Sequence, residues 1–103
     1  HEVTIYEKSD RLCGVFNAAA APEFKEKDKE FIRWIQQEIE SLPIKVEYNC
    51  EITTLAELTE DEIIIATGAK PRKLDVPGQE KAIEATEWTR TRYAKYARSS
   101  TWK

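Results

Sequence analysis

The sequence predicts an α/β fold built on a mainly parallel β-sheet. Three segments of the 103-residue chain indicate this fold: a short β-branched and aromatic stretch at residues 3–6, an amphipathic helix over 25–41, and an apolar stretch over 62–68. A strand, a long helix, a second strand and a buried strand, in this order, are typical of a parallel sheet. Right-handed crossovers would place the helix on one face of that sheet.

The first two elements follow from composition and spacing. Residues 3–6 read Val-Thr-Ile-Tyr and predict a strand that ends at the polar turn 7–10. The helix expected over 25–41 has apolar residues at spacings of three, four or seven, with charged residues between them. These apolar positions are Phe24, Phe31, Ile35, Ile39 and Leu42. Pro43 ends the helix, because proline cannot continue it.

The later elements are less uniform. Residues 45–48 alternate polar and apolar side chains, as in a half-buried or edge strand, and 51–53 could continue it. Residues 62–68 contain an unbroken apolar run, which suits a strand buried on both faces. We divide the chain at residue 86, and 87–103 form a basic, aromatic tail that we expect to be helical.

Composition excludes several classes of protein. The net charge of -3 argues against general nucleic-acid binding, and we interpret the basic tail as a solvated helix. The longest apolar run, residues 63–66, is far too short to span a bilayer. Cys13 and Cys50 lie far apart without a nearby histidine, so we expect no metal site and no redox-active disulfide. Unpaired thiols suit a reducing cytoplasm, which is where we expect the protein.

Two motifs could carry chemistry. Glu7 follows the first strand, and an acid at such a position can accept hydrogen bonds from both ribose hydroxyls of an adenosine. A solvated acid at a strand end explains Glu7 equally simply. Residues 66–69 read Ala-Thr-Gly-Ala, and these small side chains let the backbone approach a ligand or make a sharp turn.

Taken together, the motifs resemble a known group of enzymes. They are Tyr6-Glu7-Lys8, Arg11-Leu12-x-Gly14, Ala66-Thr67-Gly68-Ala69-x-Pro71 and Val76-Pro77-Gly78. In this order they are similar to the FAD-binding part of pyridine-nucleotide-dependent flavoprotein oxidoreductases. The segment 14–25 narrows the resemblance to NADH:flavin oxidoreductases of the old yellow enzyme class, which include dienoyl-CoA reductases, anaerobic enoate reductases and trimethylamine dehydrogenase. The resemblance covers residues 1 to about 86.

The resemblance implies a partial Rossmann-like nucleotide-binding fold and a set of cofactor-binding residues. At the adenosine end of FAD, Glu7 would bind the ribose, Lys8 would lie beside it, and the backbone of Ile52 would hydrogen-bond adenine. The remaining implied roles concern the rest of the cofactor. The backbone around Gly14 would face the pyrophosphate, and Thr67 and Gly68 would line the flavin side.

The chain departs from the family pattern in two places. It has Cys13-Gly14 where the family usually has two glycines, which puts close approach to phosphate in doubt. It also lacks the G-x-G-x-x-G loop and the first strand that carries it. Since the chain has no methionine and begins with His1, we expect an internal piece of a longer flavoenzyme.

The resemblance also implies cofactors and partners. The parent enzyme would use FAD and NAD(P)H, with FMN and an iron–sulfur cluster in other domains, whereas the piece would bind no cofactor and hold no catalytic residue. Without the first strand, the strands at residues 3–6 and 62–68 would have unpaired edges, so we expect rearrangement or self-association. Two alternatives stay open: a non-catalytic interaction module and a domain that binds ADP or AMP alone.

Overall fold

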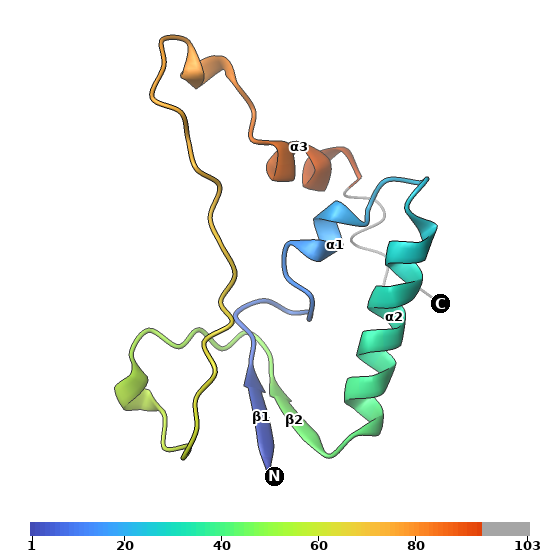
Figure 1. Cartoon of the computed structure of the whole chain (residues 1–103), viewed down its shortest axis with the longest axis vertical. Helices are drawn as coiled ribbons and strands as arrows, with labels where there is room; N and C mark the ends of the chain where they lie inside the picture. The colour runs from blue at the N-terminus through green and yellow to red at the C-terminus, as the bar shows by residue number, and fades with distance from the viewer. Residues whose placement is uncertain (94–103) are drawn as a thin grey trace.

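The computed structural model describes residues 1–93 of the chain (Figure 1). Its strands are β1 (Val3–Tyr6) and β2 (Ile44–Glu47), and its helices are α1 (Phe16–Ala19), α2 (Glu26–Ser41) and α3 (Ala85–Arg92). Two short 3-10 helices lie at Leu55–Glu57 and Gln79–Lys81. Within the described residues, no helix is both long and apolar enough to cross a membrane.

The N-terminal half forms one β–α–β unit. β1 and β2 pair in parallel, with Val3 opposite Ile44 and Tyr6 opposite Glu47. The connection between them contains α1 and α2, and α2 stands beside the sheet (Figure 1). Parallel strands need such a crossover, usually a helix, so the α/β prediction is confirmed for this two-stranded sheet. The narrower expectation of a Rossmann-like fold stays a prediction.

Helix α2 agrees with the predicted helix in its bounds but differs in its buried face. Acidic residues at the first turn, Glu26 and Asp28, suit the positive end of the helix dipole. The buried residues of α2 are Lys29 and Ile32, whereas Phe31 is 50% exposed. The predicted stripe was therefore wrong at Phe24, Phe31 and Leu42, which are 84%, 50% and 49% exposed. Phe31 contacts the rings of Phe16 and Trp34, yet half of its surface stays outside the small core.

The core is small and made mostly of small side chains. The buried apolar residues lie after β1, in and after α1, and on α2: Leu12, Ala18, Ala20, Ala21 and Ile32. The radius of gyration is 16.4 Å, against about 13 Å for a compact chain of this length. The long loop from β2 to α3 accounts for much of this difference, since it extends away from the sheet (Figure 1).

The strand predicted over residues 62–68 is wrong. This segment has no regular structure, and Ile64 and Ile65 are 91% and 70% exposed. The continuation of β2 into residues 51–53 is also wrong. A strand buried on both faces needs neighbouring strands to pair its N–H and C=O groups. Within residues 1–93, β1 and β2 pair only with each other, and residues 62–68 add to neither outer edge of this sheet.

The predicted helical tail begins as expected. Helix α3 ends at Arg92, and the part of the tail at 94–103 lies outside the described residues. Glu84 caps α3, because its carboxylate accepts hydrogen bonds from the backbone N–H groups of Thr86 at 2.8 Å and Glu87 at 2.9 Å. Arg92 lies over the ring of Trp88 at 5.3 Å in the last turn.

The cap makes α3 sensitive to acid. The hydrogen bond from the Thr86 backbone, followed by that from Glu87, holds the pKa of Glu84 below its usual value of 4.5. Because the pKa of Glu84 is lower in the folded chain than in the unfolded chain, the ionised cap stabilises α3 at pH values above the unfolded-state pKa. This stabilisation is lost as the pH falls through the folded-state pKa. We therefore expect α3 to fray in acid below pH 4.5.

Amide NMR signals of Thr86 and Glu87, followed during an acid titration, would measure this transition. Glu84→Gln should remove the transition from both signals, whereas Glu80→Gln, in the exposed 3-10 helix before α3, should leave it unchanged. Signals that do not move below pH 4.5 in the unaltered chain would contradict the cap as the cause.

Candidate functional site

The candidate site lies at the carboxyl ends of β1 and β2. Pairing between the two segments continues beyond the strands: the Glu7 N–H donates to the Glu47 carbonyl, and the Cys50 N–H donates to the Glu7 carbonyl, both at 2.9 Å. The Asn49 N–H donates to the Ser9 carbonyl, also at 2.9 Å. These bonds fix the turn after β1 against the turn after β2. The carboxyl edge of a parallel sheet is where α/β folds bind ligands.

Glu7 is the acidic group at this edge, and its side chain is half-buried. Its Oε1 accepts a hydrogen bond from the Ser9 N–H at 2.8 Å and lies 2.9 Å from the Ser9 hydroxyl. In the described part of the chain, the recorded hydrogen bonds of this carboxylate all involve Oε1. The geometry therefore holds the carboxylate in place through one oxygen and leaves Oε2 to accept a hydrogen bond from a ligand.

Lys8 and Ile52 reach the same edge. The Lys8 ammonium forms an ion pair with the Glu51 carboxylate at 3.1 Å, and both side chains are largely exposed. Ile52 follows Glu51 and is half-buried. Three of the six residues expected to bind a cofactor, Glu7, Lys8 and Ile52, are thus brought together by the pairing of β1 with β2 and the ion pair beyond it.

Gly14 lies in a tight turn that leads into α1. Cys13 and Gly14 have φ angles of 76° and 47°, in the left-handed region that glycine adopts most easily. The Phe16 N–H donates to the Cys13 carbonyl at 3.0 Å, and the Asn17 N–H donates to the Gly14 carbonyl at 3.2 Å. The turn therefore forms with Cys13 in place of glycine. A Cβ at Gly14 would meet no atom within 4 Å, so backbone conformation, and not crowding, favours glycine here.

The left-handed conformation of Cys13 predicts a stabilising substitution. A non-glycine residue in this region costs roughly 1–2 kcal/mol, and glycine costs about 0.5–1 kcal/mol through its greater freedom when unfolded. We expect Cys13→Gly to raise the free energy of unfolding by about 0.5–1 kcal/mol. Urea unfolding curves measure the change. Cys13→Ala keeps the strain and should give no gain, so equal gains in the two variants would contradict the explanation.

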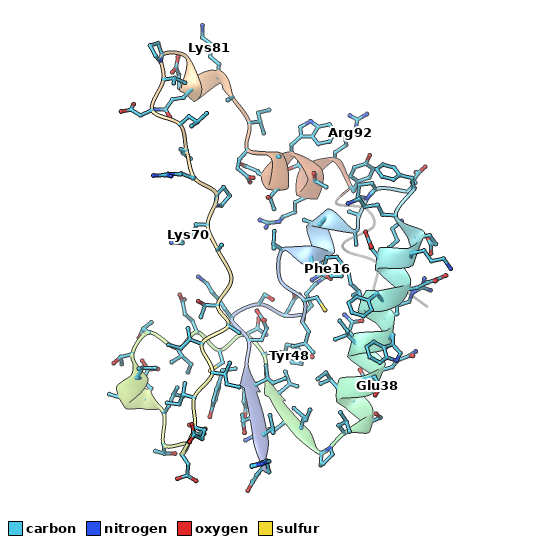
Figure 2. All side chains as sticks on the ribbon, in the orientation of Figure 1. Phe16, Glu38, Tyr48, Lys70, Lys81 and Arg92 are labelled. Atoms are coloured by element: carbon cyan, nitrogen blue, oxygen red, sulfur yellow. The ribbon has the colours of Figure 1, made fainter. Side chains whose placement is uncertain are left out.

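Thr67 and Gly68 are not joined to this edge by any hydrogen bond or ion pair recorded for the described residues. Both are exposed, and Gly68 has a φ of 79° with open space around its Cβ position. Figure 2 shows Lys70 on the extended chain that continues from them, apart from Phe16 of α1 and Tyr48 beyond β2. Their expected role beside a flavin stays a prediction.

An open hollow nevertheless lies between the segments next to Gly14 and Gly68. A space of about 610 Å³ is bordered by Val15, by the loop Ala69–Pro71 and by the first turns of α3. The residues that line it are the cap Glu84 and, in α3, Thr86, Glu87 and Arg90. Residues adjacent to Gly14 and Gly68 thus border one hollow. Sequence reasoning missed the α3 side of this hollow, although an acid before a run of helix-compatible residues is a recognisable cap signal.

A second missed contact connects β1 to the long loop. The Tyr6 hydroxyl donates a hydrogen bond to Glu60 Oε1 at 2.6 Å. This bond raises the pKa of Tyr6 and lowers the pKa of Glu60. The sequence indicated only a turn at Glu60, because residues 54 positions apart show no local signal of contact. The bond holds the start of the exposed segment near β1.

Other chemical groups are not assembled at the site. Burial raises the pKa of the Cys13 thiol, which disfavours the reactive thiolate. Cys13 and Cys50 are both free thiols. Among residues 1–93, no three His, Cys, Asp or Glu side chains are grouped closely enough to hold a metal ion. The arrangement of the described residues at this edge is suited to binding.

Comparison with known proteins shows partial similarity to three oxidoreductases. The chain is 29% identical over 89 residues to the cinnamate reductase of Clostridium sporogenes. It is 34% identical over 83 residues to the NADH oxidase of Thermoanaerobacter brockii. It is 27% identical over 96 residues to the N,N-dimethylglycine/sarcosine dehydrogenase of Chromohalobacter salexigens. No protein-family model matches the chain, and no solved structure matches it significantly.

The extent of these alignments limits what they show. They cover 84%, 79% and 85% of this chain but only 13%, 13% and 14% of the respective relatives. The chain therefore has distant, partial homologues among oxidoreductases that are much longer than it is. These three relatives confirm the predicted similarity to oxidoreductases. The narrower assignment to the old yellow enzyme class stays a prediction.

Proposed function

We propose that the chain is the part of a flavin-dependent NAD(P)H oxidoreductase that contacts the adenosine half of FAD. The observation that carries the proposal is the carboxylate of Glu7 at the carboxyl end of β1, held through Oε1 by Ser9. A carboxylate offers acceptors only, which matches the two hydroxyls of a ribose. The names of the three relatives, a reductase, an oxidase and a dehydrogenase, support electron transfer as the activity of the whole protein.

Each part of the site has a role in this proposal. Glu7 accepts hydrogen bonds from the ribose, and the backbone beside Ile52 receives adenine at the same edge. The cation of Lys8 lies next to the ribose. The pyrophosphate passes the turn at Gly14, and the flavin side lies toward Thr67 and Gly68, across the hollow bordered by Val15 and Ala69. When bound, the flavin supplies the redox chemistry, and the residues of this chain bind and orient its nucleotide end.

Calorimetry tests the binding part of the proposal. The whole protein, freed of its flavins, should bind ADP and FAD saturably, whereas the chain by itself should bind neither and show no flavin absorbance. Saturable binding of ADP by the chain itself would favour the alternative of a domain that recognises ADP or AMP alone. In the whole protein, NAD(P)H should bleach the yellow absorbance of a bound flavin. Absence of any flavin from the purified whole protein would contradict the proposal.

A second candidate function rests on the exposed segment at residues 62–68. We propose as the alternative a non-catalytic module that self-associates through this segment and the outer edge of β1. Ile64 and Ile65 are 91% and 70% exposed, and β1 pairs on one side only within residues 1–93. Unpaired strand edges beside apolar side chains are a template for association. A monomeric mass by light scattering, together with cooperative unfolding, would count against this alternative.

A further inference from the structure

A small basic pocket lies on the side of the molecule formed by α1 and α2. It has a volume of about 40 Å³ and is bordered by the turn after β1, the end of α1 and one face of α2. Its lining residues are Arg11, Asn17, Ala20, Ala21, Lys29, Ile32 and Arg33. Three of these side chains are cationic, and none of the lining residues is acidic.

The two pocket cations on α2, Lys29 and Arg33, both pair with an acid outside the pocket. Lys29, Ile32 and Arg33 lie on one face of the helix because they are spaced by three and four residues. Glu26 forms ion pairs with the Lys29 ammonium at 3.6 Å and with Nη2 of Arg33 at 3.1 Å. Only 7% of the Lys29 side chain is exposed. One carboxylate thus serves two cations, one of which is almost fully removed from water.

Arg33 also has a donor that the described residues do not satisfy. Its Nε is buried and has no hydrogen-bond partner in the described structure. Leaving a buried donor without a partner is costly, so such groups usually have an acceptor. Arg11, from the turn after β1, contacts Asp10 at 3.5 Å, at the limit of a hydrogen bond. Three cations thus line the pocket, and one of them, Arg33, has an unused donor in its side chain.

We propose that this pocket binds a small oxyanion, a phosphate or a carboxylate group, with the guanidinium of Arg33 as its central cation. Arg11 and Lys29 supply the surrounding positive charge. The volume of about 40 Å³ exceeds the space that one water needs and suits a group of a few heavy atoms. Planar guanidinium groups favour oxyanions because their N–H donors match the spacing of the oxygens. The site is separate from Glu7 and does not depend on the proposed cofactor.

NMR of the arginine side chains tests the site directly in the unaltered chain. Titration with inorganic phosphate or with acetate, at constant ionic strength maintained with chloride, should shift the Nε–H signal of Arg33 along a saturable curve. A response to phosphate alone identifies a phosphate site, and a response to acetate identifies a carboxylate site. An Arg33 signal that responds to neither anion, or linearly to both, would overturn the proposal.

Matched variants separate this site from general attraction of anions. Arg33→Gln removes the Nε donor and one charge, and should weaken anion binding at least tenfold. Lys27→Gln removes one charge from a side chain on the same helix that is 94% exposed, and should leave binding within a factor of two. Equal losses in the two variants, measured by calorimetry, would show that net charge and not the pocket is responsible. Circular dichroism confirms that each variant keeps its helix.

Discussion

Replacing Ile32 with alanine should lower the free energy of unfolding by about 2–4 kcal/mol. Ile32 is the buried isoleucine of α2, and it packs in a core whose other apolar members, apart from Leu12, are alanines. Alanine neighbours cannot extend into the space that a lost side chain leaves, so the cavity stays open. Because small domains are only marginally stable, a loss of this size should leave much of the chain unfolded at room temperature.

Ile64→Ala is the matched control for that experiment. Ile64 is 91% exposed, so the same change in composition should alter the free energy of unfolding by less than about 0.5 kcal/mol. Urea unfolding followed by tryptophan fluorescence measures both variants, since Trp34 stacks on Phe31 of α2. Equal losses at the two positions would mean that the 62–68 segment is buried in solution, as self-association would require.

Replacing Glu7 with alanine in the whole protein, freed of its flavins, should weaken ADP binding by about 10–100-fold. Hydrogen bonds to a charged group contribute about 1.5–3 kcal/mol, and each 1.4 kcal/mol corresponds to about a tenfold change in affinity. Glu7→Gln keeps an oxygen that can accept from Ser9 but removes the charge, so its loss should be smaller. Calorimetry with ADP measures both variants.

Glu38→Ala serves as the control for Glu7. Glu38 is an exposed acid on α2 (Figure 2), away from the carboxyl edge of the sheet, and its removal changes the net charge by the same amount. ADP affinity should therefore stay within a factor of two. If Glu38→Ala and Glu7→Ala weaken binding equally, the carboxylate of Glu7 does not contact the nucleotide. An unfolding curve for each variant separates lost binding from lost structure, because Glu7 also holds Ser9.

Secondary-structure elements could be predicted where the sequence pattern that specifies them lies within a short stretch of neighbouring residues. The β-branched run predicts β1, and apolar spacing with Pro43 after it predicts α2 to within one residue of its observed start. Glu7 was located at a strand end for the same reason. These predictions succeed because backbone preference and helix periodicity depend on residues close together in sequence.

Burial was harder to predict, since it depends on which other segments of the chain pack against a residue. An apolar run at residues 62–68 forms a buried strand only if it pairs with strands on both sides, and in the described chain it pairs with neither β1 nor β2. Phe31 has the periodicity of a core residue, yet it is 50% exposed although its ring contacts those of Phe16 and Trp34. The bond from Tyr6 to Glu60 likewise joins residues with no sequence signal in common.

The sequence by itself determined β1, α2, the strand that follows Pro43 and the acid that follows β1. Only the tertiary structure decided that Glu7, Lys8 and Ile52 lie at one edge, through the bond from Cys50 to Glu7 and the ion pair from Lys8 to Glu51. It also decided that Arg11, Lys29 and Arg33 surround one pocket. The physical reason is the same in both cases: contacts between distant segments depend on the path of the whole chain, whereas local conformation depends on neighbours in sequence.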